Sequence, residues 1–253
     1  MIHVAAAALL AAVAPSPGAA APANIGLSAV PARLTLVGTA QTTITVRNPG
    51  SRRLVVAASR ARFGLSARGK PRVVSGRTGP DWLTVRPRRL LVGPGRAAKL
   101  TVSAARPAQE QPGDHPALVL LTTRPLAGAR VRVRLRIGVV VVLHVPGRIV
   151  RRLRPLRLTV HRLGRERLLE LRLANRGNVT EALDGGRLRL VLVRRGRVVA
   201  TVRLVPRELL PHSVGIAEFV YRGRLRGAVG ARVEVRLRPR GRLLGRRVFR
   251  LRL

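Results

Sequence analysis

The sequence lacks cysteine altogether. A disulfide framework, a thiolate zinc site and a cysteine nucleophile are therefore excluded. Any folded structure must be stabilised by hydrophobic cores alone, and a chain of 253 residues is long enough for two cores of ordinary size. Hydrophobic residues make up 46% of the chain, a share too high for a solvated, disordered polymer.

Aromatic residues are scarce, with three phenylalanines, one tryptophan and one tyrosine. Proteins that bind single-stranded nucleic acid use aromatic side chains as platforms on which the bases stack. The few aromatic residues here are instead spaced as core residues, and Trp82 is expected to anchor a sandwich core. Nucleic acid is therefore disfavoured as the ligand.

Acidic residues are few as well: ten Asp plus Glu stand against fifty Lys plus Arg, for a formal net charge of +40. Only Lys70 and Lys99 are lysines. Two explanations remain open, the codon bias of a GC-rich genome and selection for anion binding. Under either explanation the surface attracts anionic polymers, and this attraction weakens as salt rises.

Residues that could perform catalysis are scattered. No two histidines have metal-ligand spacing, and Asp114-His115 lies in a proline-flanked segment predicted to be a turn, where a structural aspartate is favoured. Glu166 and Glu170 are expected to pair with neighbouring arginines at a solvated strand end, and Asn178-Val179-Thr180 matches the glycosylation sequon, a frequent chance match. We therefore predict a non-enzymatic protein without a metal or a cofactor.

The first residues have the layout of a secretory signal. The apolar run from Val4 to Ala14 is too short to span a bilayer, and small residues from Ala19 to Ala23 follow it, although no Lys or Arg precedes it. We predict a signal peptide over residues 1–23, cleaved before Ala21 or Asn24. No later stretch is long and apolar enough for a membrane helix, so a secreted or extracytoplasmic protein without a transmembrane anchor is expected.

After this leader, apolar and polar residues alternate with period two in short runs, and turn residues recur about every ten residues, which is typical of β-sandwiches. The first series of strands is predicted at 43–47, 54–58, 82–85, 90–92, 98–102, 117–122 and 130–145, and the second at 156–163, 168–174, 188–193, 198–204, 216–221, 233–237 and 248–253. Pro146-Gly147 separates the two series. We predict an all-β protein with two immunoglobulin-like antiparallel sandwich domains in tandem, at 24–147 and 148–253.

The run from 130 to 145 is the clearest predicted strand, because every odd position is apolar. The even positions begin with a row of arginines and change to apolar residues after Gly138, where a bulge or bend is expected. The row consists of Arg130, Arg132, Arg134 and Arg136. It is either a solvated outer face or a strip that holds the phosphates or carboxylates of an anionic wall polymer.

The second half of this strand is apolar on both faces. Val139, Val141 and Leu143 alternate with Val140 and Val142. Charged residues or proline usually prevent an exposed edge strand from pairing with another chain, but this segment contains neither before Pro146. Two interpretations remain open. The second apolar face is either buried at the junction with the second domain, or it docks another chain through backbone hydrogen bonds and the valine side chains.

Several motifs of the first domain resemble periplasmic pilus-assembly chaperones. They are Val85-Arg86-Pro87 through Leu90, Gly93-Pro94-Gly95 with Leu100-Thr101-Val102, Pro112 to Pro116 with the strand after it, and the long strand from Arg134 to Pro146. The resemblance covers residues 26–147, and Asn175 to Asn178 is similar to the Asn-rich turn of the second chaperone domain. It implies two immunoglobulin-like domains and a protein client.

The chain also departs from that family. The resemblance implies an anchor for a client carboxylate made of a basic residue on the first strand, which Arg33 matches, and a lysine on the long strand, where positions 139–143 are Val-Val-Val-Val-Leu. The layout is also similar to Gram-positive WxL-interacting proteins, whose two domains bind peptidoglycan and a partner protein, although the membrane helix that normally follows is lacking. The composition resembles that of actinobacterial proteins, and a chaperone–usher system is unexpected in those bacteria, so the second family is favoured.

These observations predict an exported, non-enzymatic binding protein associated with the cell envelope, an adaptor that joins a cell-surface or secreted protein to an anionic wall polymer. The alternative is a secretion chaperone that binds its client by β-strand addition. The predicted partner-binding residues are Arg33, Val139, Val140, Val141, Val142 and Leu143, and the predicted polymer contacts are Arg130, Arg132, Arg134 and Arg136.

Overall fold

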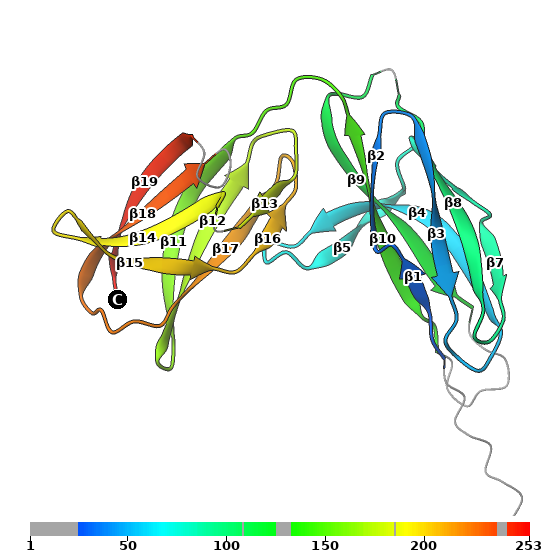
Figure 1. The fold of residues 1–253 in the computed structure, drawn as a ribbon, viewed down its shortest axis with the longest axis horizontal. Helices are drawn as coiled ribbons and strands as arrows, with labels where there is room; N and C mark the ends of the chain where they lie inside the picture. Colours follow the sequence, from blue (N-terminus) through cyan, green and yellow to red (C-terminus); the bar gives the residue numbers. More distant parts are fainter. Residues whose placement is uncertain (1–24, 108, 125–132, 185, 237–241) are drawn as a thin grey trace, which may run out of the picture.

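The computed structural model describes residues 25–253, except 108, 125–132, 185, 237–241 and the side chains of 75–78. Within this part of the chain the regular structure is entirely β-strand, and no helix there is long and apolar enough to cross a membrane. The strands form sandwiches of mostly antiparallel sheets, as the alternating sequence predicts (Figure 1).

The first sandwich packs two sheets face to face. One sheet has the order β1 (Ser28–Val30), β3 (Ala40–Arg47), β8 (Ala97–Ala104), β6 (Leu83–Arg86). The other has the order β2 (Arg33–Val37), β10 (Arg136–Val145), β9 (Gly113–Thr123), β4 (Leu54–Leu65), β5 (Pro71–Thr78), and β7 (Arg89–Val92) also pairs with β4. All of these pairs are antiparallel except β2 with β10, which is parallel.

The core of this sandwich consists of the inward-facing residues of both sheets, including Ile44, Leu100, Leu121 and Val141, none of which is exposed. Trp82 is 6% exposed and packs in the same core, which confirms it as a sandwich anchor. Its indole is the only one in the chain, so its fluorescence reports on this domain alone.

The second sandwich begins after the segment that follows Pro146. Its strands have the order β11 (Leu153–Leu163), β12 (Glu166–Asn175), β17 (Val214–Tyr221), β15 (Arg197–Leu204), β14 (Leu188–Arg194), β18 (Ala228–Arg236), β19 (Leu243–Arg252). β15 and β17 share only two residue pairs, so few hydrogen bonds join these strands. The strands on either side of this weak pairing form two layers, which pack around a core that includes Phe219, Leu171 and Val233. A short pair, β13 (Glu181–Leu183) with β16 (Arg207–Leu209), covers one end.

An equivalent asparagine lies at the end of a core strand in each domain: Asn48 directly follows β3, and Asn175 is the last residue of β12. Asn48 donates from Nδ2 to the carbonyl oxygens of Arg52, Val92 and Gly93, and its Oδ1 accepts the amide of Gly50. Asn175 makes the same kind of set in the second domain, with the carbonyl oxygens of residues 179, 209 and 210 and the amide of residue 177. Both asparagines are 1% exposed, so each satisfies several loop carbonyls that would otherwise be buried without partners.

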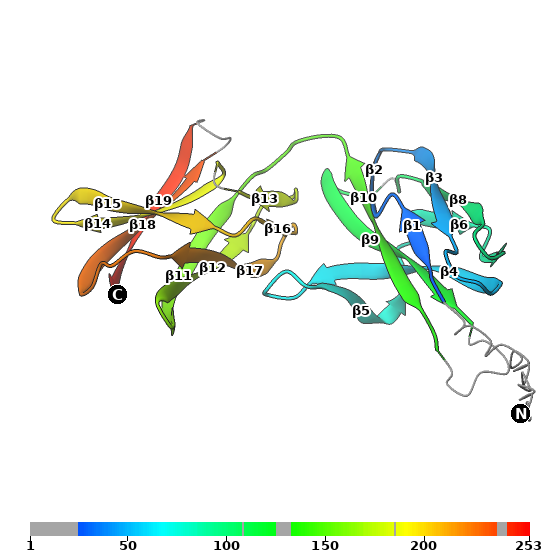
Figure 2. The same cartoon turned by 60° about the horizontal axis from the view of Figure 1, so that its bottom comes forward.

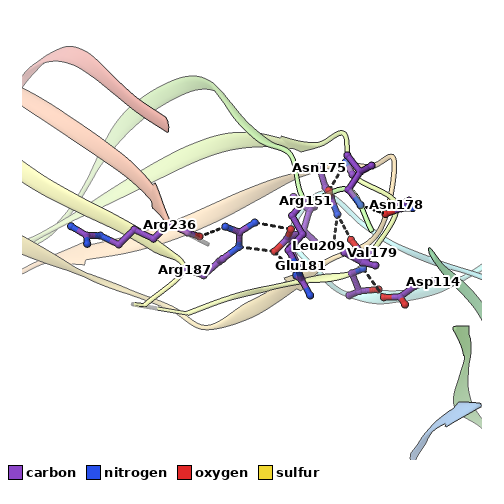
Figure 3. A network of polar contacts seen from close by, with 12 residues as sticks. Asp114, Arg151, Asn175, Asn178, Val179, Glu181, Arg187, Leu209 and Arg236 are labelled. Carbon is purple, nitrogen blue, oxygen red and sulfur yellow. Dashed lines mark hydrogen bonds and ion pairs between the residues drawn. The ribbon is translucent and has the colours of Figure 1, made fainter. Parts of the chain in front are cut away.

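A buried ion pair stabilises one end of the second sandwich (Figure 3). Arg187 donates from Nε and Nη2 to the two carboxylate oxygens of Glu181, each at 2.7 Å, and Arg151 donates to the same carboxylate at 3.2 Å. The Glu181 side chain is 1% exposed and that of Arg187 is 6% exposed. The sequence does not reveal this pair, because its two residues lie on either side of a turn and carry no recognisable motif.

The expectation of a bulge at Gly138 is wrong. β10 and β9 stay in continuous register from Arg136 to Val145, with Gly138 opposite Leu120. A Cβ at Gly138 would lie 3.3 Å from a methyl carbon of Leu118, so glycine here leaves room for a neighbouring side chain. The strand is also shorter than predicted: it begins at Arg136, and residues 133–135 lie outside it.

Candidate partner-binding site

One edge of β10 is only partly covered. β2 pairs with β10 from Val140 to His144, and the first bond of this ladder runs from the Val140 amide to the Ala32 carbonyl oxygen. On the other edge the Leu135 carbonyl oxygen accepts the Thr123 amide, so odd-numbered backbone groups point to β9. The backbone groups of Arg136 and Gly138 therefore point to the same edge as the Val140 amide, and within the described part of the chain no strand is paired with β10 at these two residues on that edge.

The predicted partner-binding valines lie mostly inside the protein. Val139, Val141 and Leu143 are at most 1% exposed and belong to the core of the first sandwich. Val142 is 3% exposed, and Val140 is half-buried in a small cluster on the outer face of the sheet. The cluster consists of Ala61, Phe63, Leu118, Leu120 and Val140. Of the five positions, only Val140 thus presents an appreciable side-chain surface.

Arg33 lies opposite Val140 in the parallel ladder. Its guanidinium donates to the carboxylate of Glu208, which belongs to β16 of the second domain. The basic residue that matches the chaperone anchor is therefore already paired with a carboxylate of the same chain. Both side chains remain about two-fifths exposed, with values of 39% and 42%, so the pair is accessible to solvent.

The arginine row lies at the entrance to β10. Arg130 and Arg132 lie outside the described residues, whereas Arg134 precedes the strand and Arg136 is its first residue. Both described side chains are exposed, and neither forms an ion pair within the described part of the chain. The row was expected to continue along a strand, but only Arg136 stands in a described one.

The two domains are joined near the linker by a set of hydrogen bonds centred on Asn178 (Figure 3). Its Oδ1 accepts the Val150 amide at 2.7 Å, while Nδ2 donates to the carbonyl oxygens of Pro112 and Arg148. The backbone oxygen of Asn178 also accepts the Asp114 amide at 2.8 Å. The Asn178 amide of the sequon is thus fully engaged in the structure.

Asp114 completes this joint. It is the second residue of β9, so the prediction of a turn aspartate is wrong about its place, although its carboxylate is satisfied as predicted. Oδ2 accepts the Thr180 amide of the second domain at 2.7 Å, and Oδ1 lies 2.7 Å from Nδ1 of His144. Asp114 therefore has a structural role that its sequence neighbours did not reveal.

A second contact between the domains is made by the tip of the β4–β5 hairpin, which reaches the β12–β17 surface (Figure 2). The Ala67 carbonyl oxygen accepts the Ile216 amide at 2.8 Å, so the contact includes a backbone hydrogen bond. Arg68 binds Glu170 at 2.6 Å and Glu218 at 2.9 Å, and the hydrogen bond to Glu170 raises the pKa of Arg68. Glu170 is buried and faces the first domain, which corrects the expectation of a solvated strand end.

Arg207 supports the same hairpin tip. It donates to the carbonyl oxygens of Ala67 and Ile216, and burial lowers the pKa of its guanidinium, although Glu218 opposes this effect. Gly69 lies so close that a Cβ there would be 2.8 Å from Nη2 of Arg207. The hairpin tip therefore fits against the second domain with little free space.

Asp114→Ala is expected to loosen the joint between the domains. It removes the acceptor for a part-buried amide and the partner of His144, so the free energy of unfolding should fall by about 1–3 kcal/mol. Urea unfolding followed by Trp82 fluorescence and by far-UV circular dichroism measures this loss. Asp81→Ala is the control, because the Asp81 carboxylate is 96% exposed and should change stability by less than about 1 kcal/mol. Equal losses for both variants would contradict the role given to Asp114.

Comparisons with known proteins place the fold. No protein-family model matches the chain, and no curated protein matches its sequence. A solved structure described as a chaperone–tip adhesin complex of CFA/I fimbriae biogenesis matches with a TM-score of 0.53 and 10% identity, over 89% of this chain and 98% of that chain. The class 5 fimbriae chaperone CfaA matches with a TM-score of 0.51 and 10% identity, over 90% of this chain and 100% of that chain.

These likenesses show the fold. The two immunoglobulin-like sandwiches in tandem are confirmed, and the resemblance to pilus-assembly chaperones is supported at the level of architecture. Neither structure is described as a WxL-interacting protein, so that resemblance gains no support from them.

Proposed function

We propose that this protein is an extracytoplasmic, non-enzymatic binding protein that holds a segment of an exported polypeptide as an added strand on β10. The observation that carries the proposal is the register of β2, which covers β10 only from Val140 onward. The backbone groups of Arg136 and Gly138 remain available to an incoming strand. An uncovered strand edge is a template for pairing with another chain, and proteins usually blunt such edges.

The fold supports this function over the adaptor function that the composition favoured. Two solved structures with this fold are described as a fimbriae chaperone and as a chaperone–tip adhesin complex. Binding of an anionic wall polymer gains no support from them. The client of this chain is accordingly proposed to be a secreted protein, and chaperone-like capture is preferred to bridging between a partner and the wall.

The chemistry of capture is proposed to differ from a carboxylate anchor. No lysine stands on β10, and Arg33 already binds Glu208. A client strand would therefore be held by backbone hydrogen bonds and by apolar side chains placed beside Ile137, which packs partly buried against the sandwich core. The preferred client segment alternates apolar and polar residues and needs no free carboxyl terminus.

Selection from a displayed library of short peptides tests this function. We expect the wild-type protein to enrich peptides with apolar residues at alternate positions, with no preference for the peptide's carboxyl end. Binding should persist when the carboxylate is amidated, because the proposed contacts are made by the backbone and by apolar side chains. Enrichment limited to acidic peptides without alternation would point to charge attraction and contradict strand addition.

The proposal also requires export. If residues 1–23 are a secretory signal, mass spectrometry of the protein isolated from its natural host should find an amino terminus between Ala20 and Gly26. An intact Met1 on protein recovered from the cytoplasm would contradict both the signal and the proposed location.

A further inference from the structure

A hollow at one end of the second sandwich is lined mainly by arginine. The β11–β12 turn meets the loop between β17 and β18 there, around a cavity of about 440 Å³. Its lining consists of Arg165, Arg167, Arg222, Arg224 and Arg226 with Gly164, Gly223 and Leu225. Five of the eight lining residues thus carry a positive charge, a density far above that of the chain as a whole.

The loop that carries three of these arginines rests on a buried side chain. The hydroxyl of Tyr221 accepts the Leu225 amide at 3.1 Å, and Tyr221 is 7% exposed. Gly223 lies against the same ring, where a Cβ would come within 2.1 Å of the hydroxyl oxygen. Gly227 then pairs with Leu253 through two backbone hydrogen bonds of 3.0 and 3.1 Å. The backbone of this loop is therefore fixed by its packing against Tyr221 and Leu253, and the packing holds the three arginines in place.

The positive charges of this hollow are poorly compensated. Glu166 binds Nε of Arg222 at 2.7 Å, and no other lining arginine forms an ion pair within the described part of the chain. Nε of Arg167 is buried and finds no hydrogen-bond partner among the described residues. Like charges held around one space repel each other, and a buried donor without an acceptor costs free energy, so an anion in the hollow would relieve both.

We propose that this hollow binds a phosphate-bearing anion with several negative charges, such as an oligophosphate chain. A guanidinium presents two parallel N–H donors that match two phosphate oxygens, and several arginines around one cavity can hold adjacent phosphates. β12 runs from Glu166 at this end to Asn175 at the domain junction, so the hollow lies about 30 Å from that junction at ~3.3 Å per residue. The site is therefore separate from the β10 edge and does not depend on the function proposed for it.

Titration of the full-length protein with sodium tripolyphosphate in a calorimeter tests the proposal. The variant R165Q/R224Q/R226Q removes three exposed side chains that make no hydrogen bond within the described structure. We expect wild-type protein to bind with a saturable stoichiometry of about one, and this variant to bind at least about tenfold more weakly. Hydrogen exchange should slow at residues 164–167 and 222–227 when tripolyphosphate is added.

The matched control is R52Q/R53Q/R96Q, which removes the same charge from exposed turns of the first domain. It should keep its affinity within about twofold, because only long-range attraction is lost. Equal weakening in both variants, or citrate binding as tightly as tripolyphosphate, would overturn the phosphate site. Circular dichroism confirms folding of each variant, and R224Q alone serves as the pocket variant if the triple variant unfolds.

Discussion

Glu181→Gln is expected to lower the free energy of unfolding by about 3 kcal/mol, the low end of the ~3–5 kcal/mol lost when one partner of a buried ion pair is removed. Glu181 and Arg187 are almost completely buried and joined by two hydrogen bonds of 2.7 Å. The substitution leaves the Arg187 guanidinium without an opposite charge. The NH2 group of the new amide then faces an N–H group of Arg187, so two donors point at each other. Far-UV circular dichroism during urea unfolding measures the effect.

Two further variants separate this ion pair from a general effect of charge. Glu166→Gln removes an exposed pair with Arg222, whose side chains are 41% and 73% exposed, and should cost less than about 1 kcal/mol. The double variant E181L/R187M should recover much of the loss, because apolar side chains of similar volume replace a buried pair at little cost. The Trp82 transition of the first domain should move less than the overall transition. A loss below about 1 kcal/mol in E181Q would show that the pair is not buried as described.

Arg136→Pro is expected to abolish most peptide binding while leaving the fold intact. The Arg136 amide points to the uncovered edge of β10, so proline removes a donor that only an incoming strand would use. Affinity for a selected peptide should fall at least about tenfold, since one lost hydrogen bond is worth roughly 0.5–1.5 kcal/mol and the proline ring also obstructs pairing. Fluorescence anisotropy of a labelled peptide measures the change.

Arg136→Gln is the matched control, because it removes the same charge and keeps the backbone donor. It should retain binding within about twofold at moderate salt, where charge attraction is screened. If both variants lose binding equally, the guanidinium and not the strand edge makes the contact. That outcome would favour the anion-binding interpretation of Arg134 and Arg136.

The sequence predicts the fold class because an exposed sandwich strand must alternate its apolar residues, and this alternation is visible without any tertiary information. The strand starting near Leu54 and the strand over 188–193 are confirmed at nearly the predicted positions. β5 was not predicted, and β4 continues well beyond the expected end at Ala58. These residues form a long hairpin with polar positions on both faces, so they lack the alternation on which the prediction depended.

The contacts between the domains could not be predicted in the same way. Asp114 and Thr180 are brought together only by the packing of one domain against the other, as are Arg68 and Glu170. Even the Asn-rich turn, which was identified by resemblance, gave no indication that Asn178 binds the linker and the first domain at once. An Asn-x-Gly signal was present at Asn48 and Asn175, and comparing the two would have revealed the repeated asparagine before the structure did.

The predicted partner-binding valines lie on β10, the strand whose edge we propose as the docking site, but most of their side chains are in the core. Alternating valines mark β10 as buried, and their side chains are indeed in the core, so they cannot provide the specificity that was expected of them. The proposed docking surface is instead the backbone edge of β10, and the length of that edge depends on where β2 begins. That boundary follows from the three-dimensional register and has no signature in the composition of either strand.

Amide hydrogen exchange on the protein with and without a selected peptide tests strand addition on β10. We expect the amides of Arg136 and Gly138 to exchange freely in the unbound protein and to become strongly protected when the peptide pairs with β10. The Val140 amide, already bonded to Ala32, should be protected in both states. Protection of Arg136 and Gly138 without peptide, or no change on binding, would contradict strand addition at this edge.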